Sequence, residues 1–477
     1  MADPNGFLKH KRREAEHRPV HMRVRDWAEM YEPVDVPALK AQASRCMDCA
    51  IPFCNSLNGC PLGNLIPDWN DLVYRDRWRD AIDRLHATNN FPEFTGRMCP
   101  APCESACVLS INDEPVTIKT IENKIIDYAW ERGWVTPVRP TVRTGKRVAV
   151  VGSGPAGMAA AQQLTRAGHD VVVYERDDRP GGLIRYGIPD FKMDKALLDR
   201  RVEQMEAEGT VFECGVDVGV DLAVEDLRSG HDAVILALGA LWQRELEIPG
   251  RHLDGVHLAM EYLVPANRVQ AGLLAAPPID AQGKQVIIIG GGDTAADCLG
   301  TAHRQGAASV HQFDIHEQPP AERPESTPWP LWPLVLRDSL AHEEGGQRMF
   351  AVQTDAFVGD QHGRVRGLQA HRVRELRRRQ YEDVPGSEFE LPAHLVLLAV
   401  GFRGPERQLL DQLGVDVTER GAVAHDSSWA TNVAGVFACG DTTRGASLIV
   451  WAIAEGRAAA AAADRYLVGE TLLPAAL

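Results

Sequence analysis

Short apolar runs rich in β-branched residues recur along the last two thirds of the chain, and several lead through a glycine-rich turn into a helical segment. Such runs predict buried strands, and their alternation with helices is typical of an α/β protein with parallel sheets. The runs occupy residues 147–151, 171–174, 232–239, 285–289 and 394–401. The runs at residues 232–239 and 394–401 are expected to be the strands at which the chain crosses between domains, with plain core strands as the alternative reading. No window of about 18 apolar residues occurs, so no membrane span is expected.

The first strand leads into the motif Gly-Ser-Gly-Pro-Ala-Gly. In a Gly-x-Gly-x-x-Gly turn the first glycine permits the tight turn, the second lets the backbone approach a pyrophosphate, and the third lets helix and strand pack closely. The next strand ends in an acidic residue about 20 positions on, where it would take the ribose hydroxyls. The sequence therefore predicts a dinucleotide site comprising Gly152, Gly154, Pro155, Ala156, Gly157 and Glu175.

A second motif of this kind follows the run at residues 285–289. It fits Gly-x-Gly-x-x-Ala, in which alanine still allows close packing. Two such units in one chain suggest an enzyme that passes hydride between a flavin and a nicotinamide nucleotide, with two unrelated nucleotide-binding domains as the alternative. The residues predicted for the second site are Gly290, Gly291, Gly292, Asp293, Thr294 and Ala295.

The C-terminal part indicates which unit holds the flavin. A strand ends in Gly440 and Asp441, and a helix begins close to Ser447. Asp441 would hydrogen-bond a ribityl hydroxyl, although an ordinary turn or N-cap aspartate is the alternative reading. The helix N-terminus would stabilise an anionic reduced flavin ring through its dipole. The first unit and this tail are therefore expected to form one FAD domain.

Seven of the ten cysteines lie in the first quarter of the 477-residue chain. Their short spacings let several thiolates converge on one centre, as iron–sulfur clusters require. Structural zinc is the stronger alternative, and disulfides are the weaker one because the basic, polar N-terminus contains no apolar signal segment. Two four-iron clusters would need one ligand more than these cysteines supply. The cysteines are Cys46, Cys49, Cys54, Cys60, Cys99, Cys103 and Cys107.

The expected fold class is α/β, with two Rossmann-like three-layer nucleotide-binding domains preceded by an α-helical iron–sulfur domain. A proline-rich linker at residues 136–141 separates the cysteine-rich part of the chain from the part in which strands and helices alternate. The expected domains are the iron–sulfur domain at residues 1–140, the FAD domain at residues 141–279 and 404–477, and an inserted NAD(P)H-binding domain at residues 280–403.

The net charge of −15 argues against nucleic acid as a partner, because phosphate binding relies on a basic surface. A local basic stretch is predicted to be a solvated extension, with docking onto an acidic partner as the alternative. With no secretory signal and no membrane span, a cytoplasmic protein is expected. The basic stretch contains Lys9, Lys11, Arg12, Arg13, Arg18, Arg23 and Arg25.

Taken together, these residues carry a family resemblance that covers nearly the whole chain. The sequence resembles the small (β) subunit of glutamate synthase and, more distantly, the N-terminal half of dihydropyrimidine dehydrogenase. The stretches that carry the resemblance are residues 46–54 (CMDCAIPFC), 99–107 (CPAPCESAC), 181–192 (GGLIRYGIPDFK) and 290–294 (GGGDT). These stretches are far more specific than a glycine turn by itself.

The resemblance implies an electron-input subunit that oxidises NAD(P)H by hydride transfer to FAD. Electrons would then pass through two 4Fe-4S clusters to a large (α) subunit, which makes L-glutamate from L-glutamine and 2-oxoglutarate. The chain would thus belong to a hetero-oligomer. The alternative is an NAD(P)H-dependent flavin reductase that serves another acceptor and uses the cysteine domain as a structural metal module.

The resemblance also implies how the ligands interleave, and it brings Gly182 and Leu183 to the FAD site. Glu122, on the helix after the last cysteine, would supply the missing ligand, with an exposed helix glutamate as the alternative. The first cluster would be held by Cys46, Cys49, Cys54 and Cys107, and the second by Cys60, Cys99, Cys103 and Glu122.

Nucleotide preference depends on the end of the second strand of the NAD(P)H unit. The strand at residues 309–314 ends in Asp314, and an acidic residue there favours a free 2′-hydroxyl. Arg304 would offset this by offering a positive charge to a 2′-phosphate. Family members with an acidic strand end often use NADH, whereas bacterial members commonly use NADPH, which is the nucleotide expected here.

Two further features remain open at the level of sequence. The proline-rich insert at residues 319–346 is expected to be a rigid loop, with a lid over the nicotinamide site as the alternative, and its tryptophans would suit a partner surface. A redox disulfide between Cys298 and Cys439 is a weaker alternative, because the spacing of these two cysteines matches no CxxC pair.

Overall fold

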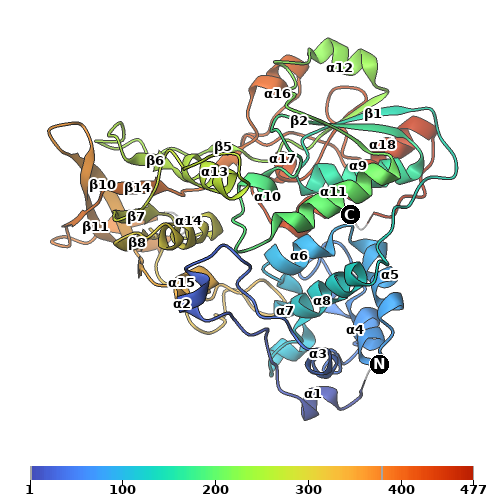
Figure 1. The fold of residues 1–477 in the computed structure, drawn as a ribbon, viewed down its shortest axis with the longest axis horizontal. Helices are drawn as coiled ribbons and strands as arrows, with labels where there is room; N and C mark the ends of the chain where they lie inside the picture. The colour runs from blue at the N-terminus through green and yellow to red at the C-terminus, as the bar shows by residue number, and fades with distance from the viewer. Residues whose placement is uncertain (1–2, 378–379, 476) are drawn as a thin grey trace.

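The computed structural model describes residues 3–377, 380–475 and 477. Figure 1 shows three lobes that meet near the centre of the molecule: a helical lobe in blue and cyan, a lobe in green and red, and an elongated lobe in yellow and orange. The green and red lobe combines early and late parts of the chain, so the chain leaves this lobe and later returns to it.

The helical lobe is a frame of short helices that hold the cysteine-bearing loops. In α8 the side chains of Ile118, Ile121 and Ile125 are spaced three or four residues apart, so they share one face, and all are buried. Pro92 and Pro102 begin α6 and α7, where the N–H that proline lacks would have no partner within the helix. The helices are α1 (Gly6–Lys9), α2 (Val20–Arg23), α3 (Val36–Ala43), α4 (Ile66–Tyr74), α5 (Trp78–Thr88), α6 (Pro92–Met98), α7 (Pro102–Ser105) and α8 (Ile118–Glu131), with 3₁₀ turns at η1 (Phe53–Asn55) and η2 (Val108–Ile111).

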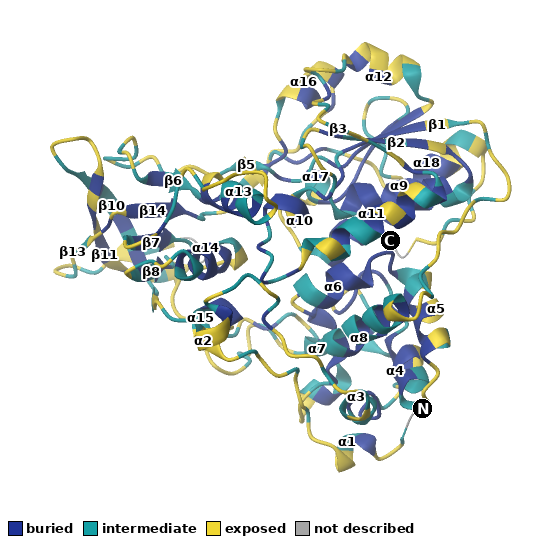
Figure 2. Cartoon of the chain, in the orientation of Figure 1, coloured by how far each residue is buried: buried dark blue, intermediate teal, exposed yellow. Residues whose placement is uncertain are grey.

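The green and red lobe is built on a five-stranded parallel sheet in the order β16-β4-β1-β2-β3. The last strand of the sequence, β16, pairs with β4, so separate parts of the chain form one sheet. Figure 2 shows β1, β2, α9 and α18 as the buried centre of the lobe. The strands are β1 (Arg147–Val151), β2 (Asp170–Glu175), β3 (Val211–Cys214), β4 (Ala233–Leu236) and β16 (Val436–Ala438); the helices are α9 (Pro155–Ala167), α10 (Leu183–Tyr186), α11 (Lys195–Glu208), α12 (Val224–Gly230), α16 (Gln408–Leu413), α17 (Asp441–Arg444) and α18 (Ile449–Val468).

The elongated lobe contains a second five-stranded parallel sheet, in the order β6-β14-β7-β8-β9, and an antiparallel sheet beyond it. The structure confirms the predicted fold class, because a helical lobe comes first in the sequence and two parallel sheets with flanking helices follow it. The parallel strands are β6 (Val256–Leu258), β7 (Gln285–Ile289), β8 (Ser309–Phe313), β9 (Gln347–Met349) and β14 (Leu395–Leu398); the helices are α13 (Ala259–Gln270), α14 (Asp293–Arg304) and α15 (Leu340–Glu343); the antiparallel strands are β10 (Val352–Gly359), β11 (Val365–Arg377), β12 (Gln380–Asp383) and β13 (Phe389–Pro392).

The chain passes between these two lobes through a short antiparallel ribbon. Strand β5 (Trp242–Gln243) follows β4 on the way out, and β15 (Phe402–Gly404) follows β14 on the way back. The expected domain start at residue 280 needs correction, because β6 precedes that residue and pairs with β14 of the second sheet. A three-residue strand such as β6 carries too little pattern to be assigned without its partner.

The N-terminal segment joins the helical lobe to the elongated one. Trp27 and Met30 pack against Phe191 and Leu340 in a small apolar cluster. The ring of Phe191 lies beneath α14, where a Cβ added at Gly300 would be 2.8 Å from its Cζ atom. The end of the sequence stretch 181–192 therefore forms a joint between the two nucleotide-binding lobes.

The basic stretch near the N-terminus is only partly the solvated extension that the sequence predicted, because Lys9, Lys11, Arg13 and Arg25 are exposed whereas Arg12 and Arg23 are not. Arg23 is fully buried and lies 2.8 Å from a carboxylate oxygen of Glu343 and 3.1 Å from one of Glu344. Arg12 bonds Glu104 at 2.6 Å within the helical lobe. Arg12 and Arg23 therefore form ion pairs inside the chain, each with a carboxylate from a distant part of the sequence.

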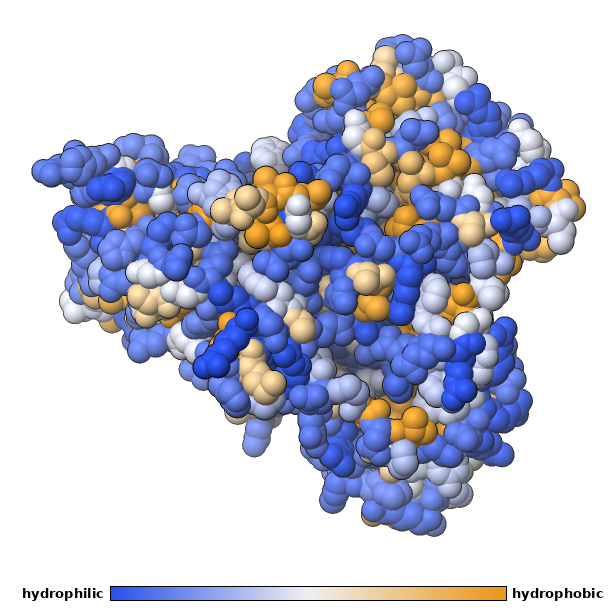
Figure 3. All heavy atoms as spheres, viewed as in Figure 1, coloured by the Kyte–Doolittle hydropathy of each residue, from blue (hydrophilic) through white to orange (hydrophobic). Residues whose placement is uncertain are grey.

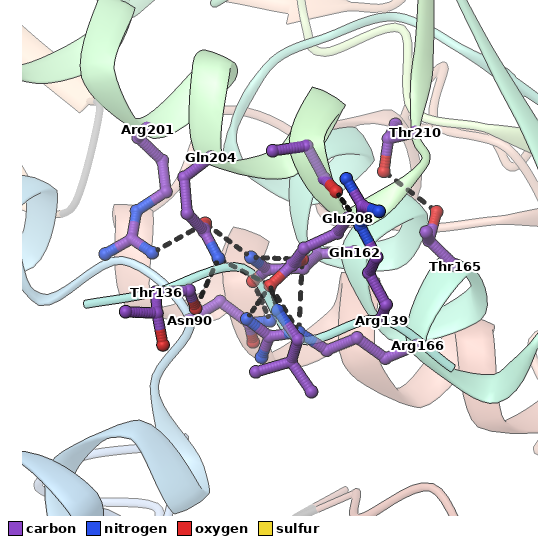
Figure 4. Close-up of polar contacts among 12 residues, drawn as sticks. Asn90, Thr136, Arg139, Gln162, Thr165, Arg166, Arg201, Gln204, Glu208 and Thr210 are labelled. Atoms are coloured by element: carbon purple, nitrogen blue, oxygen red, sulfur yellow. Dashed lines mark hydrogen bonds and ion pairs between the residues drawn. The ribbon is translucent and has the colours of Figure 1, made fainter. Parts of the chain in front are cut away.

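Buried polar side chains connect the helical lobe to the green and red lobe (Figure 4). The green and red lobe carries the predicted FAD residues and is called the FAD lobe below. The amide of Asn90 donates to Gln162 at 2.7 Å, and Gln162 donates to Gln204 and Glu208, both at 3.1 Å. Arg201 donates to Gln204 at 3.0 Å. Because these groups satisfy one another away from water, they define how the two lobes sit together.

The face of the molecule drawn in Figure 3 is largely hydrophilic, with separate apolar patches over each lobe. Among the residues that the structure describes, no helix has both the length and the apolar character needed to cross a membrane.

Candidate functional sites

The first glycine turn has the geometry that close approach to a phosphate requires. Gly152 has a φ of 100°, a left-handed conformation that side chains other than glycine rarely adopt. A Cβ on Gly157 would lie 1.9 Å from the carbonyl oxygen of Gly152, so only glycine lets α9 pack this closely. The N-terminus of α9, capped by Gly154, points into the turn and offers free N–H groups to an anion.

Glu175 at the end of β2 is held in place by its neighbours. Its Oε2 accepts from the backbone N–H of Ser153 at 3.1 Å and also from the Ser153 hydroxyl, and its Oε1 accepts from the N–H of Asp177 at 2.9 Å. The same hydroxyl accepts from the N–H of Gly181 at 2.8 Å. Ser153, which the sequence did not single out, thus connects the glycine turn, the carboxylate of Glu175 and the loop before α10.

A cleft of about 370 Å³ extends from this turn along the sheet edge. It brings together most of the predicted FAD residues: Gly152, Gly154, Pro155, Ala156, Glu175, Gly182, Leu183 and Asp441. The sequence missed further lining residues that carry no motif, among them Arg176, Leu238, Gln408, Met260 and Val264. Met260 and Val264 come from α13, so the elongated lobe contributes to the wall of this cleft, the predicted FAD cleft.

Three predicted FAD residues act next to the cleft rather than in its wall. Gly157 allows the helix to pack, as described above. The N–H of Gly440 donates to Glu455 at 2.9 Å, and a Cβ at Gly440 would lie 2.7 Å from that of Ala156. Ser447 donates its hydroxyl to Asp441 at 2.7 Å. Burial raises the pKa of the Asp441 carboxyl, and the hydrogen bonds from Ser447 oppose that shift.

The second glycine turn joins β7 to α14 and has a comparable shape. Gly290 has a φ of 140°, and a Cβ there would lie 2.2 Å from the carbonyl oxygen of Ala399 on the neighbouring strand end. Asp314, directly after β8, lies against this turn, since a Cβ on Gly291 would be 1.8 Å from its carboxylate. Gly292 caps α14, which begins with Asp293, Thr294 and Ala295. Asp314 therefore lies where the ribose of a nucleotide on this turn is expected.

Arg304 does not face that site, contrary to the sequence prediction. Its guanidinium bonds Glu344 through two contacts of 2.6 and 2.9 Å, and both side chains are at most 1 % exposed. It also stacks over the ring of Phe191 at 3.9 Å and donates to the carbonyl of Asp26. Arg304 is directed inward because the α14 face that carries it packs against the N-terminal segment and α15.

The cysteines gather into two separate hollows of the helical lobe. The first is lined by Cys46, Cys49, Cys54 and Cys107 together with Phe53, Ile66 and Ile118. Burial raises the pKa of the Cys46 thiol to about 11, and burial followed by proximity to Cys107 raises that of Cys49. Thiols crowded in this way stay protonated unless a cation binds among them, which is the expected behaviour of a metal site in its metal-free form.

The second hollow is lined by Cys60, Cys99 and Cys103 together with Glu122 and Lys119. Glu122 is buried, and its Oε1 accepts from Asn89 at 3.0 Å and from the hydroxyl of Thr95. Burial raises the pKa of its carboxyl to about 7. The alternative prediction for Glu122, an exposed glutamate on a helix, is therefore wrong, because α8 turns this side chain inward among the cysteines.

The two hollows gather the thiol donors that iron–sulfur clusters take as ligands. Within the described ranges, no three side chains among His, Cys, Asp and Glu converge closely enough to hold one metal ion. All ten cysteines are free thiols, and Cys298 and Cys439 lie in different lobes.

The two hollows and the FAD cleft adjoin one another. Ile66 lines both hollows. In the first turn of α18, Val450 lines the second hollow while Ala452 lines the FAD cleft. One helix turn therefore separates the flavin cleft from the second hollow, and one side chain separates that hollow from the first.

Comparisons with known families agree with both halves of the chain. A family model described as pyridine nucleotide-disulphide oxidoreductase matches residues 146–456. A model described as dihydroprymidine dehydrogenase domain II, 4Fe-4S cluster, matches residues 23–134. The fold and the sites thus define an FAD- and NAD(P)-binding oxidoreductase with an iron–sulfur domain.

Curated relatives narrow the class to one family. The glutamate synthase (NADPH) small chain of Mycobacterium tuberculosis is 64 % identical, covering 100 % of this chain and 98 % of the relative. That of Bacillus subtilis is 46 % identical, covering 99 % and 100 %. Glutamate synthase (NADH) of Saccharomyces cerevisiae is 45 % identical over 98 % of this chain and 22 % of its own length. The chain belongs to the glutamate synthase small-chain family, which confirms the resemblance inferred from its sequence.

Solved structures agree on the fold of the nucleotide-binding part. FprA from Mycobacterium tuberculosis superposes with a TM-score of 0.53 at 21 % identity, covering 66 % of this chain and 83 % of that one. At that identity the likeness concerns the fold alone.

Proposed function

We propose that this chain is the electron-input subunit of a glutamate synthase. It oxidises NAD(P)H by hydride transfer to FAD, and electrons leave through two 4Fe-4S clusters to a large subunit that makes L-glutamate from L-glutamine and 2-oxoglutarate. The subunit is cytoplasmic and works as part of a hetero-oligomer. The observation that carries this proposal is the continuity of the three sites, with Val450 and Ala452 of one helix turn facing the second hollow and the flavin cleft.

The residues of the flavin site bind and orient rather than react. Bound FAD supplies the hydride acceptor, so the protein needs no nucleophile. Glu175 is placed to accept from ribose hydroxyls, and Asp441, held by Ser447, to accept from the ribityl chain. The first turn of α18 lies beside the cleft, which Ala452 lines, so the positive end of the helix dipole would stabilise negative charge on a reduced flavin.

The cysteine residues would hold the two clusters, which supply one-electron carriers. Cys46, Cys49, Cys54 and Cys107 suit the first, and Cys60, Cys99 and Cys103 with Glu122 suit the second. A carboxylate is a harder ligand than a thiolate, so Glu122 would set the second cluster apart in potential. Burial of the second set also keeps water from the cluster nearer the flavin.

We propose NADPH as the nucleotide, because the Mycobacterium tuberculosis and Bacillus subtilis relatives are both glutamate synthase (NADPH) small chains. Asp314 works against that choice, because its carboxylate lies on the glycine turn where a 2′-phosphate would come close. With Arg304 buried against Glu344, it gives no compensating charge at that position.

The proposal is tested on the full chain purified without oxygen. Iron, zinc and flavin are counted per chain, the visible spectrum is recorded, and NADPH oxidation is followed with an artificial acceptor. Broad absorbance near 400 nm beyond the flavin bands is the approximate position expected for thiolate-bound clusters. Binding to the large chain is then tested by co-purification, and glutamate formation by adding glutamine and 2-oxoglutarate. Two results contradict the proposal. One is bound zinc with a flavin-only spectrum; the other is a chain that oxidises NADPH but supports no glutamate formation by the large chain.

A further inference from the structure

The insert between β8 and β9 of the elongated lobe does not end at the nicotinamide site. It crosses to the helical lobe and returns, as the yellow-orange segment between α15 and α7 in Figure 1. Arg323 folds the insert back on itself by donating to the carbonyls of Thr327 at 3.1 Å and Leu331 at 2.6 Å. The same guanidinium donates to the carbonyl of Ser105 at 3.1 Å. The turn of the insert is therefore anchored to the helical lobe at a defined place.

The insert is anchored to the loop that carries Cys107, the last cysteine of the helical lobe. The indole N–H of Trp329 donates to the carbonyl of Cys107 at 3.2 Å. The Trp329 ring packs on Phe53, with centroids 4.7 Å apart. Phe53 lies between Cys49 and Cys54 and lines the first hollow. One side chain of the insert thus touches both loops that supply ligands to the first hollow.

The other end of the insert is bonded to the nicotinamide turn. His342 of α15 shares a hydrogen bond of 2.9 Å with the Oε1 of Gln312, and Gln312 donates through Nε2 to the carbonyl of Gly290 at 2.9 Å. Asp338 of the insert pairs with Arg348 of β9 at 2.6 Å. These contacts fix the far end of the insert to the nucleotide-binding lobe, so the insert that carries Trp329 spans the two lobes.

We infer that Trp329 is a positioning residue for the first cluster, supplied by the NAD(P)H-binding lobe, and that it shields this cluster from water. The inference rests on the proposed function, since it assumes a cluster in the first hollow. The shield is needed there because Cys46, Cys49 and Cys107 are only half-buried, whereas the three cysteines of the second hollow are buried. Expectations of a plain rigid loop and of a lid over the nicotinamide site both miss this contact.

Solvent exposure is one of the factors that set the potential of an iron–sulfur cluster. Reduction adds negative charge, and water stabilises that charge better than an indole ring does. Removal of the ring should therefore make the first cluster easier to reduce and more accessible to oxygen. The lost N–H bond to Cys107 acts on a carbonyl rather than on sulfur, so it is the smaller contribution.

The test uses the full chain with its iron and FAD in place and compares Trp329→Ala, Trp329→Phe and Trp332→Ala. Trp332 is the matched control, because it belongs to the same insert and stacks on Arg337 at 3.9 Å. Redox titration followed by EPR separates the two clusters, and the bleaching rate of the visible absorbance in air reports access to the cluster. Iron and FAD contents are measured for every variant.

We expect Trp329→Ala to shift one cluster potential in the positive direction, leave the other unchanged and speed bleaching several-fold. Trp329→Phe keeps a ring on Phe53 and should stay near the wild type, as should Trp332→Ala. An iron-replete Trp329→Ala chain with both potentials unchanged overturns the inference alone. Equal shifts in both clusters, or the same shift in Trp332→Ala, also overturn it by showing general loosening. A wild-type chain without two clusters overturns the proposed function itself.

Discussion

Single residues in this chain take roles that depend on which way their element turns them. Glu122 and Arg304 are both charged residues on helices; Glu122 is 6 % exposed, and the side chain of Arg304 is 1 % exposed. Glu122 faces three cysteines in a hollow, whereas Arg304 faces Glu344 in an internal ion pair. The carboxylate is available to a metal, and the guanidinium is not available to a nucleotide.

Glu122→Ala should lower the iron content by about half, because one of two clusters loses a ligand. Glu131→Ala is the matched control, since Glu131 lies on the same helix but is exposed. Iron is counted per chain, and EPR shows which cluster is affected. Two intact clusters with unchanged spectra in Glu122→Ala would rule out the ligand role.

Asp314→Ser should change nucleotide preference without changing the fold. Loss of the carboxylate removes repulsion toward a 2′-phosphate and removes an acceptor for a 2′-hydroxyl. The ratio of kcat/KM for NADPH to that for NADH should rise roughly tenfold, equivalent to about 1.4 kcal/mol. Asp338→Ser, an acidic residue of the insert paired with Arg348, serves as the control. An unchanged ratio would mean that the ribose binds elsewhere.

At the scale of elements, α14 and α15 form a clamp with the N-terminal segment. Arg304 of α14 and Arg23 of α2 both reach Glu344, at the end of α15. Phe191 from the FAD lobe lies under the guanidinium of Arg304. Three parts of the chain that are distant in sequence thus depend on one buried carboxylate.

Arg304→Met should destabilise the fold by about 3 kcal/mol, because it leaves part of a buried charge unpaired. Urea unfolding measures the loss, and Arg304→Lys, which keeps the charge, should lose less. The KM values for NADPH and NADH should stay unchanged. A raised KM for NADPH with unaltered stability would instead support the original nucleotide-binding prediction.

His342 of α15 predicts a specific pH dependence. Burial lowers the pKa of its imidazole to about 4, whereas an unfolded histidine titrates near about 6.5. As pH falls below that value, the unfolded state takes up a proton that the folded state does not, so stability is lost between about pH 6.5 and 4. His342→Gln should remove this component. The melting temperature of both proteins is measured against pH, and parallel curves would contradict the assignment.

At the scale of the whole molecule, the helical lobe and the FAD lobe share buried polar contacts (Figure 4). Arg201 of α11 forms two hydrogen bonds with Glu93 of α6, at 2.6 and 3.1 Å, and both side chains are at most 1 % exposed. Arg457 of α18 donates to Asn90 at 2.6 Å. These contacts join the helical lobe to α11 and α18 of the FAD lobe, and α18 is the helix whose first turn lines both the second hollow and the cleft.

A double-mutant cycle on Glu93 and Arg201 tests that connection. Glu93→Gln and Arg201→Met should each cost about 3–5 kcal/mol, since each leaves a buried charge unpaired. The double variant should cost less than their sum, with a coupling of about 0.5–3 kcal/mol. Cluster absorbance and flavin fluorescence follow unfolding of the two lobes separately. The control Arg143→Ala, at an exposed pair with Asp170, should cost no more than about 1 kcal/mol. Strict additivity would show that the pair does not couple the lobes.

The sequence by itself determined the features whose physics is local. A glycine at residue 152 or 290 is required by a positive φ and a close backbone approach, and the cysteine spacings restrict which thiols share a loop. The alternation of apolar runs and helices was sufficient to predict two parallel sheets.

Tertiary structure decided the features that need a distant partner. Strand β6 became visible through its pairing with β14, Arg304 was turned inward by Glu344, and Trp329 reached Cys107 across more than 200 residues. Burial and ion pairing depend on which surfaces meet, and no local pattern encodes the distant surface. The motifs therefore predicted the cofactors, while packing decided which side chains face them.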